Sequence, residues 1–282
     1  AAVVALGKIG DARAAEQIRE GRKDATEDDW EYAAALYRLG SREQLDQVTP
    51  GLASVYADTR LEAARTLVEF ADSRALPALL RLAKPLKREP QTLGASSKAE
   101  GFSTRLLLAR GFAEFDSDQA RIGLIGLLED AEPEVRASAS TSLAKSNRAF
   151  PNSDSAARSV TALVAALKKE VTPMVIDAMH AALSAFDRAA VADALLEARS
   201  SDVKSNPNIN SALAGIDVTT DSQLAALTAG SLADRQRAID RLARLGDPKA
   251  VPPLIDALAT AKEPQIRVKT AEALGQLRDR RA

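Results

Sequence analysis

A stretch near the C-terminal end of the chain decides the fold: LGDPKAVPPLIDAL at 245–258, followed by EPQIRVKTAEALGQLRD at 263–279. In the first part, apolar side chains recur at helical spacing at Val251, Leu254 and Leu258. The second part carries a similar stripe at Ile266, Thr270, Ala273, Leu274 and Leu277. The pattern predicts two amphipathic helices joined by a short turn.

The start of this stretch recurs along the chain as a four-residue string: an aspartate, any residue, an arginine or lysine, and an alanine. Clear copies begin at Asp11, Asp72, Asp247 and Asp279, and degenerate copies at Ser41, Asp116, Asn147, Asp187 and Asp217. Six of the eight steps between successive copies measure 30–32 residues, and the two longer steps, of 44 and 40 residues, indicate insertions. A fixed period of this length is typical of a helical repeat protein.

The residues at the ends of each expected helix agree with a hairpin of two helices. The aspartate can accept hydrogen bonds from the free N–H groups of the first helix. Pro77 and Pro252 fall in the opening turn, where a missing N–H group does no harm. Gly40, Gly246 and Gly275 lie near the ends of second helices, where glycine favours a left-handed cap. No alternating pattern indicates a strand.

We therefore predict an all-α fold, a right-handed α-α superhelix of about nine helical hairpins in which stacked neighbours share one core. The expected solenoid spans residues 1–282 as a single domain, with an inserted loop at 84–101 and a lengthened turn at 150–156. The sequence starts within a second helix and opens a new hairpin at 279–282. We therefore expect a fragment of a longer array.

The stretches 245–258 and 263–279 resemble the short bacterial HEAT-like repeat that was first named from phycobilisome lyases. The resemblance covers nearly the whole chain and is strongest in residues 232–282 and 58–83. It implies a HEAT-like solenoid. It says little about function, because the same repeat occurs in lyases, scaffolds and regulators.

The resemblance also implies a polar ladder between repeats, because the second helix of such repeats often opens with an arginine. The matching residues are Arg60, Arg105, Arg136, Arg235 and Arg267, with the aspartates Asp72, Asp116 and Asp247 at the hairpin starts. Ile176 stands at this position in the hairpin that starts at Asn147, and Asn208 to Asn210 in the hairpin that starts at Asp187. We expect the ladder to be interrupted there.

Composition excludes several kinds of site. The chain has no cysteine and one histidine, so disulfides, thiolate zinc sites and sites with several histidines are excluded. Neighbours such as Glu129 and Asp130 do not face each other on a helix, and His180 has no second ligand. No phosphate-binding or nucleophile motif occurs. We predict no catalytic residue, no metal ligand and no cofactor.

Charge is uneven although the net charge is −1. Residues 11–31 carry eight acids and four bases, whereas residues 232–282 carry eleven bases and seven acids. The candidate partner-binding residues are Arg237, Arg241 and Arg244 on one helical face, and Lys84, Lys87 and Arg88 in the inserted loop. The alternative for the arginine strip is a solvated face that forms salt bridges with nearby aspartates.

Two aromatic clusters allow a similar choice. Trp30 and Tyr37 lie seven residues apart on one helix, and Phe112 and Phe115 share another. Core packing is the simpler interpretation, and an exposed anchor for a partner is the alternative.

These observations favour a non-enzymatic scaffold or adaptor that binds another protein. A bilin-lyase-like or tetrapyrrole-handling subunit is the alternative that the family name suggests. A DNA-binding HEAT-like protein is less favoured, because the chain has no overall positive charge. No stretch is apolar enough to span a membrane. The sequence is compatible with the cytoplasm and with the periplasm.

Overall fold

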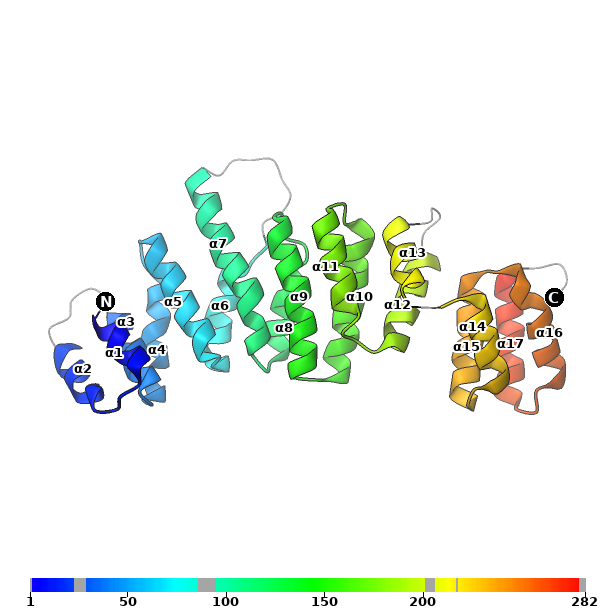
Figure 1. Ribbon diagram of the computed structural model, residues 1–282, viewed down its shortest axis with the longest axis horizontal. Coiled ribbons are helices and arrows are strands. Elements are labelled where there is room, and N and C mark those ends of the chain that lie inside the picture. The colour runs from blue at the N-terminus through cyan, green and yellow to red at the C-terminus, as the bar shows by residue number, and fades with distance from the viewer. Residues whose placement is uncertain (1, 23–28, 86–94, 201–205, 217, 279–282) are drawn as a thin grey trace. The chain divides into compact units, whose positions relative to one another are not determined.

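The computed structural model describes residues 2–22, 29–85, 95–200, 206–216 and 218–278. Within these ranges every regular element is a helix (Figure 1). The α-helices are α1 (Ala2–Ile9), α2 (Ala14–Arg22), α3 (Asp29–Arg38), α4 (Leu45–Val48), α5 (Ala57–Phe70), α6 (Leu76–Leu82), α7 (Ala95–Gly111), α8 (Asp118–Leu127), α9 (Pro133–Ala149), α10 (Ser153–Lys169), α11 (Pro173–Leu183), α12 (Arg188–Ser200), α13 (Pro207–Ala214), α14 (Thr220–Ala229), α15 (Leu232–Leu245), α16 (Val251–Thr260) and α17 (Pro264–Leu277). The 3₁₀ turns are η1 (Arg42–Gln44), η2 (Thr49–Ala53), η3 (Ser73–Ala75), η4 (Phe112–Glu114) and η5 (Pro248–Ala250). The all-α solenoid class predicted from the repeat is confirmed.

The chain divides into two compact units. Unit 1 comprises Ala1–Leu163 and Val171–Ala185, and unit 2 comprises Val164–Glu170 and Phe186–Ala282. The division passes through α10.

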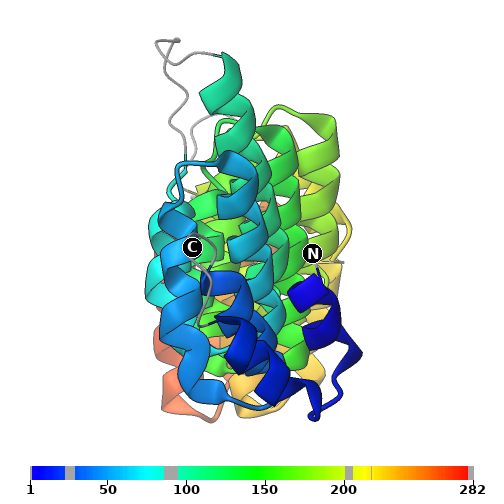
Figure 2. The same cartoon turned by 90° about the vertical axis from the view of Figure 1, so that its left-hand side faces the viewer.

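In unit 1, the second helices of successive hairpins form a row. Helix α5 packs against α7, α7 against α9, and α9 against α11. The run of helices from α5 to α11 can be followed in Figure 1, and Figure 2 shows the same helices from the N-terminal side. This row carries the candidate site described below.

The aspartate caps predicted from the repeat are confirmed at Asp11 and Asp187, which accept the backbone N–H groups of Arg13 and Ala190 at 3.0 and 2.8 Å, and at two further hairpins. The Asp72 carboxylate accepts the backbone N–H of Arg74 at 3.0 Å, and Asp247 accepts that of Lys249 at 2.9 Å. The caps at Asp72 and Asp247 each open a 3₁₀ turn that leads into α6 or α16. At the hairpin start predicted at Asp116 the cap is one residue later than expected, because Ser117 rather than Asp116 accepts the N–H of Gln119.

The predicted glycine caps are confirmed at two of three positions. Gly40 and Gly246 have φ values of 106° and 68°, in the left-handed region that favours glycine. The prediction for Gly275 is wrong, because α17 continues to Leu277 and the left-handed residue is Arg278, with φ 49°. Leu277 packs against the core of this hairpin, which explains the longer helix.

The inserted loop predicted at 84–101 is too long at its C-terminal end. Helix α7 begins at Ala95, so residues 95–101 are helical. Alanine, lysine and glutamate in this segment have high helix propensity, which favours extending the helix backwards. Residues 86–94 lie outside the described residues. The lengthened turn at 150–156 is also shorter than predicted, because α10 begins at Ser153.

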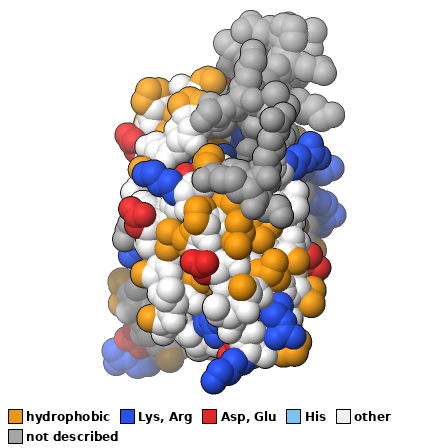
Figure 3. All heavy atoms as spheres, turned by 90° about the vertical axis from the view of Figure 1, so that its right-hand side faces the viewer, with side chains coloured by type: hydrophobic (Ala, Val, Ile, Leu, Met, Phe, Trp, Pro, Cys, Tyr) orange, Lys and Arg blue, Asp and Glu red, His pale blue; other side chains and the backbone are white. Residues whose placement is uncertain are grey.

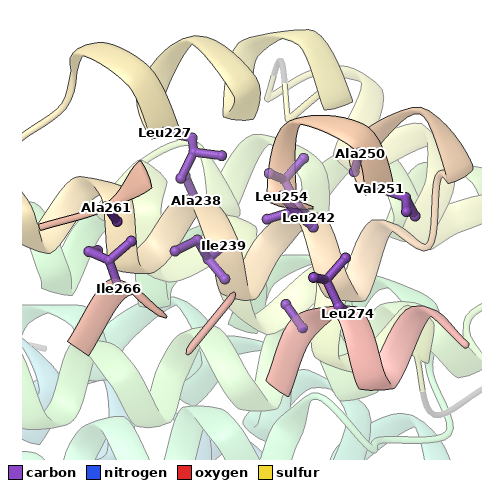
Figure 4. Packing of buried hydrophobic residues seen from close by; sticks show 11 residues of the cluster. Leu227, Ala238, Ile239, Leu242, Ala250, Val251, Leu254, Ala261, Ile266 and Leu274 are labelled. Carbon is purple, nitrogen blue, oxygen red and sulfur yellow. The ribbon is translucent and has the colours of Figure 1, made fainter. Parts of the chain in front are cut away.

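The best-defined core of unit 2 joins the two hairpins at its C-terminal end (Figure 4). It contains the predicted stripes of α16 and α17 together with residues from the preceding hairpin. Ile239 and Leu242 of α15, Leu254 of α16 and Leu274 of α17 belong to one buried cluster, in which Figure 4 shows Leu242 beside Leu254. Each fully buried aliphatic side chain of this kind contributes about 1.5–3 kcal/mol to folding. The shared core explains why one hairpin needs the next.

Among the described residues, no helix combines the length and the apolar character needed to cross a bilayer.

Candidate partner-binding face of unit 1

Three of the predicted arginines close the turn between the two helices of their own hairpin. Arg60 donates through Nη1 to the carbonyls of residues 54 and 55, at 2.7 and 3.0 Å. Arg136 contacts the carbonyls of residues 130 and 131 at 2.8 and 2.9 Å, and Arg267 those of residues 261 and 262 at 3.1 and 3.4 Å. Each guanidinium thus bonds the carbonyls five and six residues before it, where the first helix has ended.

Three predicted arginines also reach the following hairpin. Arg105 forms an ion pair with Asp130 at 2.7 Å, and both side chains are buried. Arg136 donates to the hydroxyl of Thr172 at 3.4 Å. Arg235 contacts Glu263 at 3.2 Å. These contacts are consistent with a polar ladder between repeats, which stays a prediction.

Where we expect the ladder to be interrupted, two asparagines donate to backbone carbonyls within unit 2. Asn208 donates through Nδ2 to the carbonyls of Leu167 and Glu170 at 3.0 and 2.9 Å. Asn206 donates to the carbonyl of Lys168 at 2.9 Å. The end of α10, in the hairpin that carries Ile176, is therefore bonded by asparagines of the following hairpin.

Sequence reasoning missed two buried polar residues. Asp130 is fully buried and bonded to Arg105. Arg121 is also buried, and it donates through Nε to the Ser146 hydroxyl at 3.0 Å. Each lies 25 residues from its polar partner, a spacing that differs from the 30–32-residue period, so the repeat pattern did not signal these contacts.

The predicted arginine strip on α15 is largely occupied by contacts within unit 2. Arg241 donates through Nε to Asp193 of α12 at 2.7 Å, and Arg244 lies 3.4 Å from Glu197. Arg237 is exposed and lies 3.4 Å from Asp234. The salt-bridged alternative therefore describes this strip better than a free binding surface.

The predicted residues of the inserted loop are only partly described. Lys84 is exposed just after the end of α6. Lys87 and Arg88 lie outside the described residues.

The aromatic residues mainly serve the core. Tyr37 is buried, stacks on Phe70 with ring centroids 4.0 Å apart, and donates its hydroxyl to Asp72 at 2.9 Å. Phe112 and Phe115 are buried and meet edge to face. Core packing is confirmed for these three residues.

Four exposed residues mark the outward face of the helix row in unit 1. Counting five residues beyond the arginine position of each hairpin gives Arg65 on α5, Arg110 on α7, Thr141 on α9 and Ala181 on α11. All four are exposed, and their helices pack side by side. We call this surface the second-helix face.

A hollow of about 230 Å³ opens on this face between α7 and α9. Its lining consists of Arg110, Ala137, Ser138, Thr141 and Ser142. It exists because α9 carries small side chains at positions where α7 carries Leu106 and Leu107. Sequence reasoning did not single out these residues, since no single one of them is unusual.

A second exposed surface lies at the C-terminal end of unit 2. Figure 3 shows hydrophobic side chains gathered over this end, where α16 and α17 lie in Figure 1. Val268 of α17 is one of the large exposed hydrophobic residues. Within the described part of the chain, no group of three or more histidine or acidic side chains is arranged to hold a metal ion.

Paired helices, capping aspartates and turn-closing arginines, repeated along the chain, define a helical repeat protein. Segments of the chain carry HEAT-like repeats. The family described as HEAT repeats matches residues 220–282, and the PBS lyase HEAT-like repeat matches residues 1–24 and 59–84. The resemblance inferred from the sequence is thereby confirmed.

Solved structures similar to this chain include helical proteins of several kinds. One is the complex of CpcE and CpcF of phycocyanin lyase from Nostoc, which is 18% identical. The alignment covers 83% of this chain and 94% of the matched chain, with a TM-score of 0.39. Human deoxyhypusine hydroxylase is 16% identical over 96% of this chain and 98% of its own, with a TM-score of 0.36. An archaeal HEAT-like repeats protein from Thermococcus onnurineus is 14% identical over 83% of this chain and 96% of its own, with a TM-score of 0.37. The comparison with curated proteins found no match.

Proposed function

We propose that this chain is a non-enzymatic scaffold that binds another protein on the second-helix face of unit 1. The observation that carries the proposal is the row α5, α7, α9 and α11, which presents equivalent outward positions side by side. Stacked repeats commonly use such extended helical surfaces to bind proteins or peptides.

The contacts beneath this face support the proposal because they hold the helices in fixed positions. The buried Arg105–Asp130 pair joins α7 to the turn before α9. Arg136 at the start of α9 bonds both that turn and Thr172, the N-cap residue of α11. A surface held in this way loses little conformational freedom when a partner binds.

The outward side chains also suit a protein partner. The row changes from arginine on α5 and α7 to threonine on α9 and alanine on α11, so it offers charge at one end and space at the other. The hollow between α7 and α9 is open and shallow, with room for a side chain of a partner.

Two matched variants test the proposal. Thr141 on α9 and Thr161 on α10 are both exposed, and each bonds the carbonyl four residues before it, at 3.1 and 3.0 Å. Only Thr141 lies on the second-helix face. Affinity purification from the source cell should recover a stoichiometric protein with the wild type and with Thr161→Arg. Thr141→Arg should lose it. Equal recovery by both variants would refute the proposed face.

A bilin-lyase-like or tetrapyrrole-handling role is the second candidate, favoured by the match of residues 1–24 and 59–84 to the PBS lyase HEAT-like repeat. Visible absorbance that co-purifies with the chain in proportion to its amount would support this role and contradict the purely scaffolding one. We expect no such absorbance.

A further inference from the structure

Arg110 stands out on the second-helix face because its guanidinium is exposed and makes no hydrogen bond or ion pair with any described residue. Arg65, at the equivalent position of α5, is paired with Glu62 at 3.3 Å. On α7 the position equivalent to Glu62 is Leu107. Arg110 therefore lacks the partner that its counterpart has.

Other charges near Arg110 are engaged or distant. Glu114, one turn further along the chain, is paired with Lys145 of α9. Glu134 lies seven residues before Thr141 on α9, which is about 10 Å along the helix axis. The positive charge at the hollow is thus uncompensated by these groups.

Besides Arg110, Ser138 is a polar group of the hollow that can complement an anion, whereas Thr141 uses its hydroxyl proton elsewhere. Ser138 makes no hydrogen bond with the described residues, so its hydroxyl is available as a donor. Thr141 donates its own hydroxyl proton to the carbonyl of Ala137 at 3.1 Å. A guanidinium offers five N–H donors and no acceptor, which suits a carboxylate.

We propose that this hollow binds the carboxylate of an aspartate or glutamate side chain in a segment of the partner protein. The inference rests on the proposed function and deepens it by naming the chemistry of the partner. The volume of about 230 Å³ admits one side chain, and the hollow opens onto the face along which the segment would lie.

The test uses the whole chain and a library of unphosphorylated 12-residue peptides. Peptides selected on the wild type should share an acidic residue at one position. Their affinity should fall roughly 10- to 100-fold in Arg110→Gln, as expected for loss of a charge-assisted hydrogen bond. Arg158→Gln on α10, outside the second-helix face, is the matched control and should leave the affinity within about twofold, because that exposed arginine already pairs with Asp118 at 3.2 Å.

Replacing the shared acidic residue of the peptide by its amide should weaken wild-type binding by the same factor. It should have little further effect on Arg110→Gln. Selected peptides without an acidic position, or affinities that do not change in Arg110→Gln, would overturn the inference. NMR titration followed at the Arg110 Nε–H signal gives a further check. If acetate alone binds there as tightly as the peptide does, the inference is also overturned, since the site would then be a small-anion site.

The same peptides separate this inference from the proposed function. If Thr141→Arg blocks peptide binding and Arg110→Gln does not, the face stands and the carboxylate site falls. If neither variant affects binding, the proposed face falls as well.

Discussion

The buried ion pair between Arg105 and Asp130 should make the largest single polar contribution to the stability of unit 1. The side chains are 4% and 0% exposed, and two hydrogen bonds of 2.7 and 3.3 Å join them. The Asp130 carboxylate also accepts the backbone N–H of Glu132 at 3.0 Å, in the turn before α9. Asp130→Ala would therefore leave a buried guanidinium without its counter-charge.

Removing one partner of a buried pair costs about 3–5 kcal/mol in free energy of unfolding. With a urea m-value of about 2 kcal/mol per molar, this corresponds to a fall of roughly 1.5–2.5 M in the unfolding midpoint. Glu114→Ala is the control. It breaks a pair with Lys145 in which the side chains are 47% and 57% exposed, and such pairs contribute about 0–1 kcal/mol.

Circular dichroism during urea titration measures the midpoints. Stacked repeats can unfold in parts, so hydrogen exchange of the α7 and α9 amides should accompany it. Asp130→Asn, which keeps an acceptor for Arg105, should lose less stability than Asp130→Ala. If Asp130→Ala shifts the midpoint no more than Glu114→Ala does, the buried pair does not stabilise unit 1 more than an exposed pair.

Two further predictions concern pH and packing. Hydrogen bonds from the Arg74 side chain, helped by the backbone N–H of Arg74 and the Tyr37 hydroxyl, lower the pKa of Asp72 from 3.8 to about 2. Stability from this carboxylate is thus present above about pH 4 and lost as the pH falls from about 4 through about 2. The melting temperature of Asp72→Asn should therefore change less with pH over that range than the melting temperature of the wild type. Gly111→Ala should destabilise by about 1–3 kcal/mol, because its β-carbon would lie 2.3 Å from a methyl group of Val68. Gly126→Ala in α8 should instead stabilise by about 0.5–1 kcal/mol, because the added β-carbon would meet no atom within 4 Å outside its own stretch of helix. Equal changes in the free energy of unfolding for the two variants, measured by chemical denaturation, would contradict this.

Most of the fold could be predicted from the sequence because its signals are local. Caps such as Asp72 and Asp247 bond N–H groups two residues away, and apolar stripes such as that of α17 follow the helical period. The errors also have local causes: Gly275 was placed at a helix end although Leu277 continues the buried stripe.

The candidate site was less predictable because it depends on which helices meet. Arg241 and Asp193 are 48 residues apart, so their pairing could not be read from a helical face alone. The hollow requires Arg110 on α7 to lie beside small residues on α9, and each of those residues is ordinary by itself. Comparing equivalent positions of successive hairpins would have revealed that Arg110 lacks the glutamate that accompanies Arg65.

Site-specific photo-cross-linking tests the central claim, that the second-helix face binds a protein, most directly. A photoreactive amino acid is placed at Thr141 in one sample and at Thr161 in another, since both sites are exposed and differ in the helix that carries them. After irradiation in the source cell, we expect one discrete cross-linked protein from position 141 and none from position 161. Cross-linking of the same protein from both positions, or from position 161 alone, would contradict it.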